Sequence, residues 1–372
     1  MAEKFSLKDD LFNADTIGRL AGHFEAAGVF DAAPFVADVM AALAPLELKA
    51  RINLIAEVLG RYLPDDFTAA AAAIEGALPP PLDPTRTDDD FGHFIYAPLG
   101  VFVEAHGLEH HRDRSLDLLE ALTQRFSMEF SIRAFLNRWQ GETLERMQDW
   151  LAHDHYHVRR LVSEGTRPRL PWGQNVGLTE AQTLPLLDRL HADPTRFVTR
   201  SVANHLNDIT KKNPDAVLDR LADWQSKGLQ ADKELDWMQR HALRGLIKAG
   251  HPATMAHLGY RQDLPLADIQ LSMTPTDLTR GDTAEIAVSF ICQDDAPLIV
   301  DYVVDFMKAN GKTAPKVFKM KVLKAKAGQL ISLNKRHHFK DTATTFKLYP
   351  GAHVLHLQVN GRIIASTPFA LH

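Results

Sequence analysis

The residues best suited to chemistry in this chain lie in the segment HVRRLVSEGTRPRLPW, positions 157–172. The segment contains four arginines, one acid, Glu164, and a tryptophan, Trp172. Guanidinium groups bind phosphate oxygens in pairs, an acid among them stays ionised, and an indole offers a flat face to a sugar or base. This composition favours nucleic acid over a small metabolite as the ligand. The alternative is a solvated helix face, on which Arg160 pairs with Glu164 one turn later.

Two later segments repeat this basic, helix-opening design. Arg160, Arg200 and Arg240 lie forty residues apart, close to the period of about 40 to 47 residues in HEAT-type helical pairs. Apolar residues at helical spacing precede each arginine, in TLERMQDWLAH, TLPLLDRLHAD and AVLDRLADWQ. We therefore expect helical pairs whose second helices stack side by side, as in solenoids that bind ligands along their inner face.

The same shift predicts which polar side chains share that inner face. Glu164 falls opposite Asn204, and Asp208 lies one turn beyond Asn204, so both carboxylates can face one groove. Because acids repel phosphate, their presence in a basic groove indicates a role other than binding. The cations expected to contact DNA there are Arg159, Arg160, Arg167, Arg169, Arg200, Lys211, Lys212, Arg240, Arg244 and Lys248.

These residues resemble the AlkC branch of the HEAT-like DNA alkylation repair glycosylases, which are related to the AlkD type. The resemblance covers essentially the whole helical part, in HVRRLVSEGTRPRLPW, RSVANHLNDITKKNP, ALRGLIKAGHP, LKDDLFN, LELKARI, YAPLGVFVEAHGLEH and LTQRFSMEFSIRAFL. It implies an enzyme that hydrolyses the N-glycosidic bond of cationic alkylated bases, such as 3-methyladenine, in double-stranded DNA. It also implies that the lesion is held without being flipped fully into a pocket and that the chemistry needs no cofactor.

The resemblance also implies roles for four residues. Glu164, Asp208 and Glu129 would be catalytic, and Trp172 would pack against the sugar and backbone of the lesion nucleotide. Alkylation makes the base a good, cationic leaving group, so the barrier lies in the positive charge that develops on the deoxyribose. A carboxylate beside that sugar stabilises the charge and orients water. The residues alone leave open which carboxylate dominates.

Simpler interpretations exist for three of these residues. Glu129 is followed four positions later by Arg133, so the two could form a helix ion pair, and Asp208 could pair with Lys212 in the same way. Trp172 follows a proline and could cover the core. Only the joint occurrence of these residues favours catalysis.

A domain boundary is predicted near residue 262, between a helical domain (1–261) and a β domain (262–372). Helical periodicity then gives way to alternating segments: IQLSMTPTDL, AEIAVSFICQ, LIVDYVVDFM, KVFKMKVLK, GQLISLNKRHHFK, TTFKL and AHVLHLQVNGRIIASTPFAL. About seven strands in roughly 110 residues predict an immunoglobulin-like sandwich. It lacks an intersheet disulfide because Cys292 is the only cysteine. The predicted fold class is an all-α HEAT-like solenoid followed by an all-β sandwich, and the appended domain also resembles one AlkC subgroup.

The β domain is basic, although the whole chain has a formal net charge of -5. Residues 306–340 contain nine lysines and one arginine but no acid, and local charge decides binding. Lys319 and Lys321 alternate with apolar residues, so one face of their strand reaches solvent. We expect a second DNA contact here; the alternative is that lysines protect a sheet edge. Its further candidates, in a segment expected to be a loop, are Lys335, Arg336 and His337.

The sequence offers little support for a metal site, for other catalytic motifs, or for export or membrane insertion. The histidine clusters HGLEHHR and HDHYH lack zinc-site spacing, so neither a metal nor a cofactor is expected. The sequence has no Gly-rich phosphate loop, serine elbow or cysteine nucleophile. It shows neither a signal peptide nor a membrane-length apolar run, and one cysteine fits a reducing compartment. We expect a monomer in the bacterial cytoplasm, associated with the nucleoid.

Two competing functions use the same groove. One is a non-catalytic HEAT-repeat scaffold that binds DNA or another protein, and the other is an adaptor for acidic peptides. A scaffold would bind unmodified duplex more tightly once Glu164 is replaced by Gln, whereas a glycosylase would lose excision.

Overall fold

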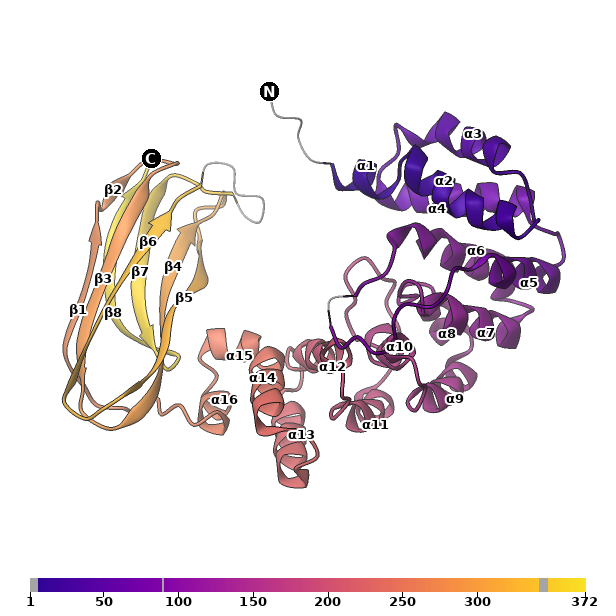
Figure 1. Cartoon of the computed structure of the whole chain (residues 1–372). Helices are drawn as coiled ribbons and strands as arrows, with labels where there is room; N and C mark the ends of the chain where they lie inside the picture. The colour runs from indigo at the N-terminus through magenta and orange to yellow at the C-terminus, as the bar shows by residue number, and fades with distance from the viewer. Residues whose placement is uncertain (1–5, 89, 341–346) are drawn as a thin grey trace. The chain divides into compact units, whose positions relative to one another are not determined.

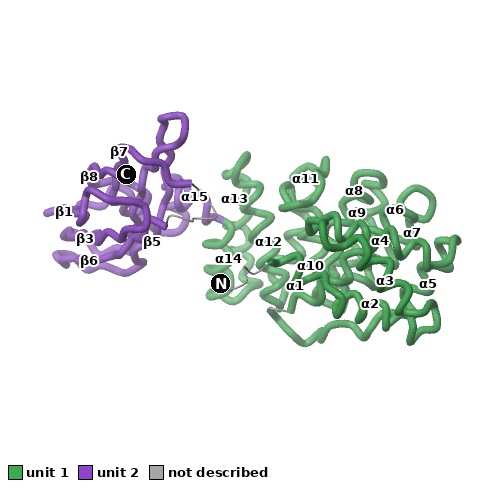
Figure 2. The backbone as a smooth tube through the Cα atoms, turned by 90° about the horizontal axis from the view of Figure 1, so that it is seen from above, with its two compact units in different colours: residues 1–242 green, residues 243–372 purple. Residues whose placement is uncertain are grey.

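The structure is a computed structural model that describes residues 6–88, 90–340 and 347–372. It divides into two compact units, residues 1–242 and 243–372 (Figure 2). The first unit is helical, and the second consists of β-strands with two short helices. The predicted fold class is confirmed. Within the described ranges, no helix combines the length and apolar character needed to cross a membrane.

Local sequence sets the ends of the helices in the first unit. At the start of α2, the Asn13 side chain accepts a hydrogen bond from the Thr16 backbone N–H, and the Thr16 hydroxyl accepts one from the Asn13 N–H. Pro214 opens α13, and Gly228 ends it with a left-handed φ of 59°. The helical elements are α1 (Leu7–Leu11), α2 (Ala14–Ala26), α3 (Ala32–Leu43), α4 (Leu48–Tyr62), α5 (Phe67–Ala77), η1 (Phe94–Tyr96), α6 (Ala97–Gly107), α7 (Arg112–Thr123), α8 (Ile132–Arg138), α9 (Gln140–Trp150), α10 (Tyr156–Gly165), α11 (Glu180–Leu190), α12 (Arg196–Ile209), α13 (Pro214–Lys227) and α14 (Asp232–Ala242).

The second helices of three successive pairs, α10, α12 and α14, lie side by side, and their partners α9, α11 and α13 form a second row (Figure 1). The predicted stacking is therefore confirmed. Central α12 contacts both neighbours and buries Phe197, Val202 and Leu206. The prediction that each spaced arginine opens a helix is wrong for Arg240, which lies in the last turn of α14. That helix starts at Asp232, earlier than a forty-residue repeat requires.

The second unit is a sandwich of two sheets, as the strand pattern predicts. One sheet has the order β1-β3-β6 and the other β2-β8-β7-β4-β5. Along β3, Ile286, Val288 and Phe290 are buried and alternate with more exposed residues, so the strand turns one face to the core. The elements are α15 (Arg244–Ala249), α16 (Pro252–His257), β1 (Leu266–Thr274), β2 (Asp277–Leu278), β3 (Thr283–Cys292), β4 (Ala296–Met307), β5 (Thr313–Ala325), β6 (Gln329–His338), β7 (Gly351–Val359) and β8 (Arg362–Leu371).

Two details of the β domain differ from the sequence reading. The NKRHHF segment lies mostly within β6, because it pairs antiparallel with β3, and is not a loop. Helices α15 and α16 belong to the second unit, so the compact units divide before the predicted boundary at residue 262. Met255 and Tyr260 pack against Ile299 of β4, which explains this grouping. Most of the predicted strand TTFKL lies outside the described residues.

Candidate active site

The three predicted catalytic carboxylates come from separate parts of the first unit. Glu164 is the penultimate residue of α10, Asp208 lies near the end of α12, and Glu129 lies in the turn before α8. Because α10 and α12 are neighbours, Glu164 and Asp208 reach the same guanidinium, that of Arg167. The three carboxylate side chains are only 5%, 5% and 16% exposed for Glu164, Asp208 and Glu129. They form, with Arg160 and Arg167, a nearly buried cluster that we call the carboxylate cluster.

Arg167 holds two of the carboxylates in place. Its Nη1 donates to Glu164 Oε1 at 2.6 Å, and its Nε donates to Asp208 Oδ2 at 2.9 Å. The prediction that Arg167 contacts DNA phosphate is therefore not supported by the geometry, because the side chain is buried and its donors are used inside the protein. Asp208 also accepts from Lys211 Nζ at 3.0 Å, and so pairs with Lys211 in place of the predicted alternative partner, Lys212.

Arg160 positions the third carboxylate. Its Nη1 donates to Glu129 Oε2 at 2.8 Å and to Ser127 Oγ at 3.0 Å, while Ser127 Oγ donates to the same Glu129 oxygen at 2.9 Å. The guanidinium also lies 4.5 Å from the ring centre of Phe197. The expected helical pair of Arg160 with Glu164 is present, at 3.7 Å, as one part of this network. Within the described chain, Glu129 Oε1 has no hydrogen-bond partner.

The surrounding cations keep Glu164 ionised. Burial alone would raise its pKa, but Arg160 and Arg167 beside it, together with a 2.6 Å hydrogen bond from Ser201 Oγ to Oε2, outweigh burial and lower the pKa of Glu164. Both of its oxygens are engaged, which fixes the carboxylate. Glu129 is the most exposed of the three acids and keeps one oxygen available. Sequence reasoning missed Ser201, because a serine next to Arg200 carries no distinguishing pattern.

Trp172 lies at the surface, with 63% of its area exposed, so the interpretation that it covers the core is wrong. Its backbone is left-handed, with φ of 66°, a conformation that costs a residue with a side chain roughly 1 kcal/mol or more. The Lys49 ammonium donates to the Trp172 carbonyl at 3.1 Å and helps to hold this conformation. An exposed aromatic ring on a strained backbone is typical of a functional position.

Arg133 positions the loop that carries Trp172. The guanidinium is fully buried and donates to the carbonyls of Gly165 at 2.8 Å, Arg167 at 2.9 Å and Gln174 at 2.5 Å. Burial, and then the nearby Arg167, lower the pKa of Arg133 to about 10. The alternative that Arg133 pairs with Glu129 is therefore wrong, because its Nε and Nη1 donate to backbone carbonyls and no ion pair joins the two side chains in the described chain. A sequence pattern does not reveal such side chain–backbone contacts.

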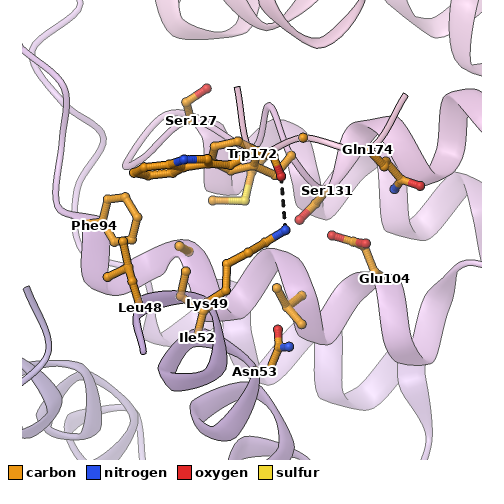
Figure 3. Close-up of a pocket in the computed structure, with 15 residues that line it drawn as sticks. Leu48, Lys49, Ile52, Asn53, Phe94, Glu104, Ser127, Ser131, Trp172 and Gln174 are labelled. Atoms are coloured by element: carbon orange, nitrogen blue, oxygen red, sulfur yellow. Dashed lines mark hydrogen bonds between the residues drawn. The ribbon is translucent and has the colours of Figure 1, made fainter. Parts of the chain in front are cut away.

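A cavity of about 260 Å³ adjoins the carboxylate cluster (Figure 3). Trp172 and Ser127 line it, and Ser127 is also a hydrogen-bond partner of Glu129. Glu104 of α6 and Asn53 of α4 contribute polar groups to an otherwise largely apolar wall. Burial raises the pKa of Glu104 to about 7, although a hydrogen bond with Ser131 and the charge of Lys49 act in the opposite direction.

Comparisons with known proteins identify the family. A family model described as "Uncharacterised protein YhaZ, C-terminal Ig-like domain" matches residues 268–372. The protein named "Uncharacterized protein YhaZ" from Bacillus subtilis (strain 168) is 32% identical over 333 residues, which cover 87% of each chain. The chain belongs to the YhaZ family. The solved structure of the Pseudomonas fluorescens alkylpurine DNA glycosylase AlkC, bound to DNA containing an abasic site analog, is 33% identical, with a TM-score of 0.88, over 99% of this chain and 100% of that chain. The AlkC resemblance seen in the sequence is confirmed.

The other cations predicted to bind DNA differ in their surroundings in this YhaZ-family chain. Arg159 is mostly buried, with its Nε 2.6 Å from Asp193, so its predicted phosphate contact is not supported by the geometry. Arg200 pairs with Asp88, and Arg240 pairs with Asp236 at 2.9 Å. The exposed cations of the first unit's predicted set are Arg169, Lys211 and Lys212.

Most of the predicted DNA-binding cations of the second unit are exposed: Lys248, Lys319, Lys321, Lys335 and Arg336. Arg244 of α15 is half-buried. His337 is different, because it is buried and its Nδ1 lies 2.9 Å from the Tyr302 hydroxyl. Burial lowers the pKa of His337 to about 4. The prediction that His337 contacts DNA is therefore not supported by the geometry, since a neutral, buried imidazole cannot pair with phosphate.

The histidine clusters form no metal site in the described part of the chain. Among those residues, no three His, Cys, Asp or Glu side chains are arranged to hold a metal ion. In HDHYH, the His155 ring nitrogen lies 3.0 Å from the Leu82 carbonyl, and that of His157 lies 2.9 Å from the Asp90 carbonyl. These histidines attach the segment before η1 to the start of α10.

Proposed function

We propose that this chain is a DNA glycosylase that removes cationic alkylated bases, of the 3-methyladenine class, from double-stranded DNA. The observation that carries the proposal is the carboxylate cluster beside the exposed Trp172 ring. Three acids are held in one nearly buried place by Arg160 and Arg167, which is more than a binding scaffold needs. The likeness to AlkC, whose structure was solved with DNA, supports the same function.

The reaction follows from the charge of its substrate. When the C1′–N bond breaks, its electron pair goes to the base, which leaves neutral, and positive charge develops on the deoxyribose. A fixed, ionised carboxylate stabilises that charge without having to reorganise. Water then forms a bond to C1′ and gives its proton to a carboxylate. Glu129 suits this contact because its Oε1 is available, whereas Glu164 and Asp208 have both oxygens engaged.

Trp172 would support the lesion nucleotide from outside. Its ring is exposed, and the loop that carries it is tied down by Arg133 and Lys49. A flat ring on a fixed loop can pack against a sugar and backbone without extruding the base fully, so we propose excision without full base flipping. Glu129, whose Oε1 is available, would then be the carboxylate that contacts C1′.

The β domain would provide a second DNA contact. The basic segment of residues 306–340 forms most of β5 and β6, edge strands of the two sheets, and the Lys319, Lys321 and Lys335 side chains are exposed there. Exposed lysines bind phosphate by displacing counterions. Edge protection explains lysines on such strands equally well, so only binding measurements separate the two interpretations.

The test is the release of free 3-methyladenine from methylated duplex DNA in a single turnover. We expect the wild type to release the base and Glu129→Gln to slow release roughly 100-fold, as for the loss of one electrostatic group. Glu164→Gln should slow release as well, and its thermal unfolding must be followed because it removes a buried charge. Glu57→Gln is the matched control, since Glu57 is 66% exposed and pairs with Arg61 on α4.

Two outcomes would contradict the glycosylase. The first is a wild type that binds duplex DNA but releases no base. The second is a Glu164→Gln protein that binds unmodified duplex more tightly and loses no chemistry, which is the behaviour of a scaffold.

A further inference from the structure

The cavity beneath Trp172 lies next to the carboxylate cluster, and the proposed reaction does not use its polar side chains Glu104, Asn53 and Ser131. We propose that this cavity binds a neutral aminopurine, and that in the working enzyme its ligand is the base just released. Only the source of the ligand rests on the proposed function. The recognition itself follows from the size, walls and polar groups of the cavity.

The size and walls of the cavity fit one nucleobase. Its volume of about 260 Å³ lies below the roughly 300 to 1,000 Å³ of pockets for drug-sized ligands. The Trp172 indole and the Phe94 ring form part of one wall (Figure 3). Stacking on an aromatic side chain is available to every base, because every base has a flat π-face. The walls therefore favour a flat ring small enough for this cavity, but they do not distinguish one base from another.

The polar groups of the cavity supply hydrogen-bond donors and acceptors for the edge of such a ring. The side chains of Glu104, Asn53 and Ser131 line the same cavity (Figure 3). A neutral carboxyl group offers an O–H donor next to a carbonyl acceptor, and a primary amide offers an N–H donor next to an acceptor. The edge of a 6-aminopurine offers the complement, an amino donor beside a ring-nitrogen acceptor. The Glu104 side chain thus matches an adenine-type edge.

The charge of the cavity favours a neutral ligand over a cationic one. Partial burial raises the pKa of Glu104 to about 7, against the opposing effects of Ser131 and of the Lys49 charge. The Lys49 ammonium, fixed on the Trp172 carbonyl, would repel a cationic base. Breaking the glycosidic bond removes the positive charge from an alkylated base. The cavity therefore fits the product better than the base still attached to DNA.

The position of the cavity connects it to the reaction. Ser127 lines the cavity and also donates to Glu129 Oε2 at 2.9 Å. A base released beside Glu129 would thus have a binding site next to the place where its bond was broken. Free base held there would slow the next turnover, so adenine and 3-methyladenine should inhibit the enzyme.

The test is calorimetric titration of the full-length protein with adenine, in the absence of DNA. We expect saturable binding that Glu104→Ala weakens about tenfold or more, because the purine loses its hydrogen-bond partner. Glu104→Gln should keep most of the affinity, since an amide retains a donor and an acceptor. Glu57→Gln, on the exposed face of α4, is the matched control.

The pH dependence provides a second readout. Binding to the wild type should weaken as the pH rises above about 7, where Glu104 loses the proton that it donates. Glu104→Gln should bind equally well on both sides of that pH. A structural role for Glu104 would not produce this difference between the two proteins.

The proposal is overturned if the wild type binds no adenine at millimolar concentration, or if Glu104→Ala and Asn53→Leu leave the affinity unchanged. Because the titration contains no DNA, its result is independent of excision. If the protein excises bases but binds no adenine, the cavity proposal is wrong and the glycosylase proposal stands. A protein that binds adenine in the predicted manner but excises nothing would support the cavity and overturn the glycosylase.

Discussion

The cations of the two units are built into the chain in opposite ways. In the first unit, Arg160 and Arg167 are largely buried, with side chains 14% and 10% exposed, and each holds carboxylates. In the second unit, Lys319 and Lys335 are exposed on edge strands. A buried guanidinium has lost its water and must be satisfied inside the protein, whereas an exposed ammonium remains available to phosphate. The buried cations shape the site, and the exposed ones are the candidates for binding DNA.

We expect the largest effect on stability from replacing the buried Arg167. Replacing Arg167 with Met leaves Glu164 and Asp208 buried without their shared cation, so we expect the free energy of unfolding to fall by about 3–5 kcal/mol. Urea unfolding at neutral pH measures this loss. Arg169→Met is the matched control, because Arg169 is exposed only two residues away and surface changes cost about 0.5 kcal/mol or less. If both variants lose the same free energy of unfolding, the buried network of Arg167 stabilises the protein no more than an exposed arginine does.

The second prediction concerns the pH dependence of the free energy of unfolding, to which the adjacent His337 and His338 should contribute differently. His337 is buried with a pKa lowered to about 4, whereas His338 is exposed. Between about pH 6.5 and 4 the unfolded chain binds a proton at residue 337 and the folded chain does not. The free energy of unfolding should therefore fall as the pH decreases through this range, by about 3 kcal/mol for this group.

Unfolding curves of two variants between pH 4 and 7 provide the check. His337→Gln should lose this part of the pH dependence, and His338→Gln should keep it. If the two variants show the same pH dependence, His337 is protonated in the folded protein and the buried arrangement is incorrect.

The sequence predicts the arrangement of elements better than the partners of side chains. The forty-residue spacing predicts that α10 and α12 are neighbours, which brings Glu164 and Asp208 to one place, because helical repeats are set by local periodicity. Whether a charged residue is buried depends on contacts that are distant in sequence. Nothing in RPR indicates that Arg167 turns inward and Arg169 outward.

The same limit applies to Trp172 and Glu104. The exposure of Trp172 follows from a left-handed backbone, which Lys49, 123 positions away in sequence, helps to hold. A tryptophan after proline predicts neither feature. Glu104 does leave a signal, since it is the only acid in the apolar helix APLGVFVEAHG. A lone acid in such a helix is either solvated at the surface or set into a cavity, and only the packing of α4 against α6 decides which.

The smallest expected effect is on the salt dependence of DNA binding, when exposed lysines of the second unit are replaced. Each phosphate contact steepens the dependence of log K on log salt by about 0.9. Lys319→Gln and Lys335→Gln should therefore each reduce that slope by up to about 0.9 and weaken binding of damaged and undamaged duplex alike. Lys227→Gln, which removes a lysine paired with Asp223 on α13, should leave the slope unchanged. Fluorescence anisotropy over a series of salt concentrations measures the slopes. If all three variants keep the wild-type slope, the lysines of β5 and β6 protect sheet edges, and the first unit binds the duplex through its own exposed cations, Arg169, Lys211 and Lys212.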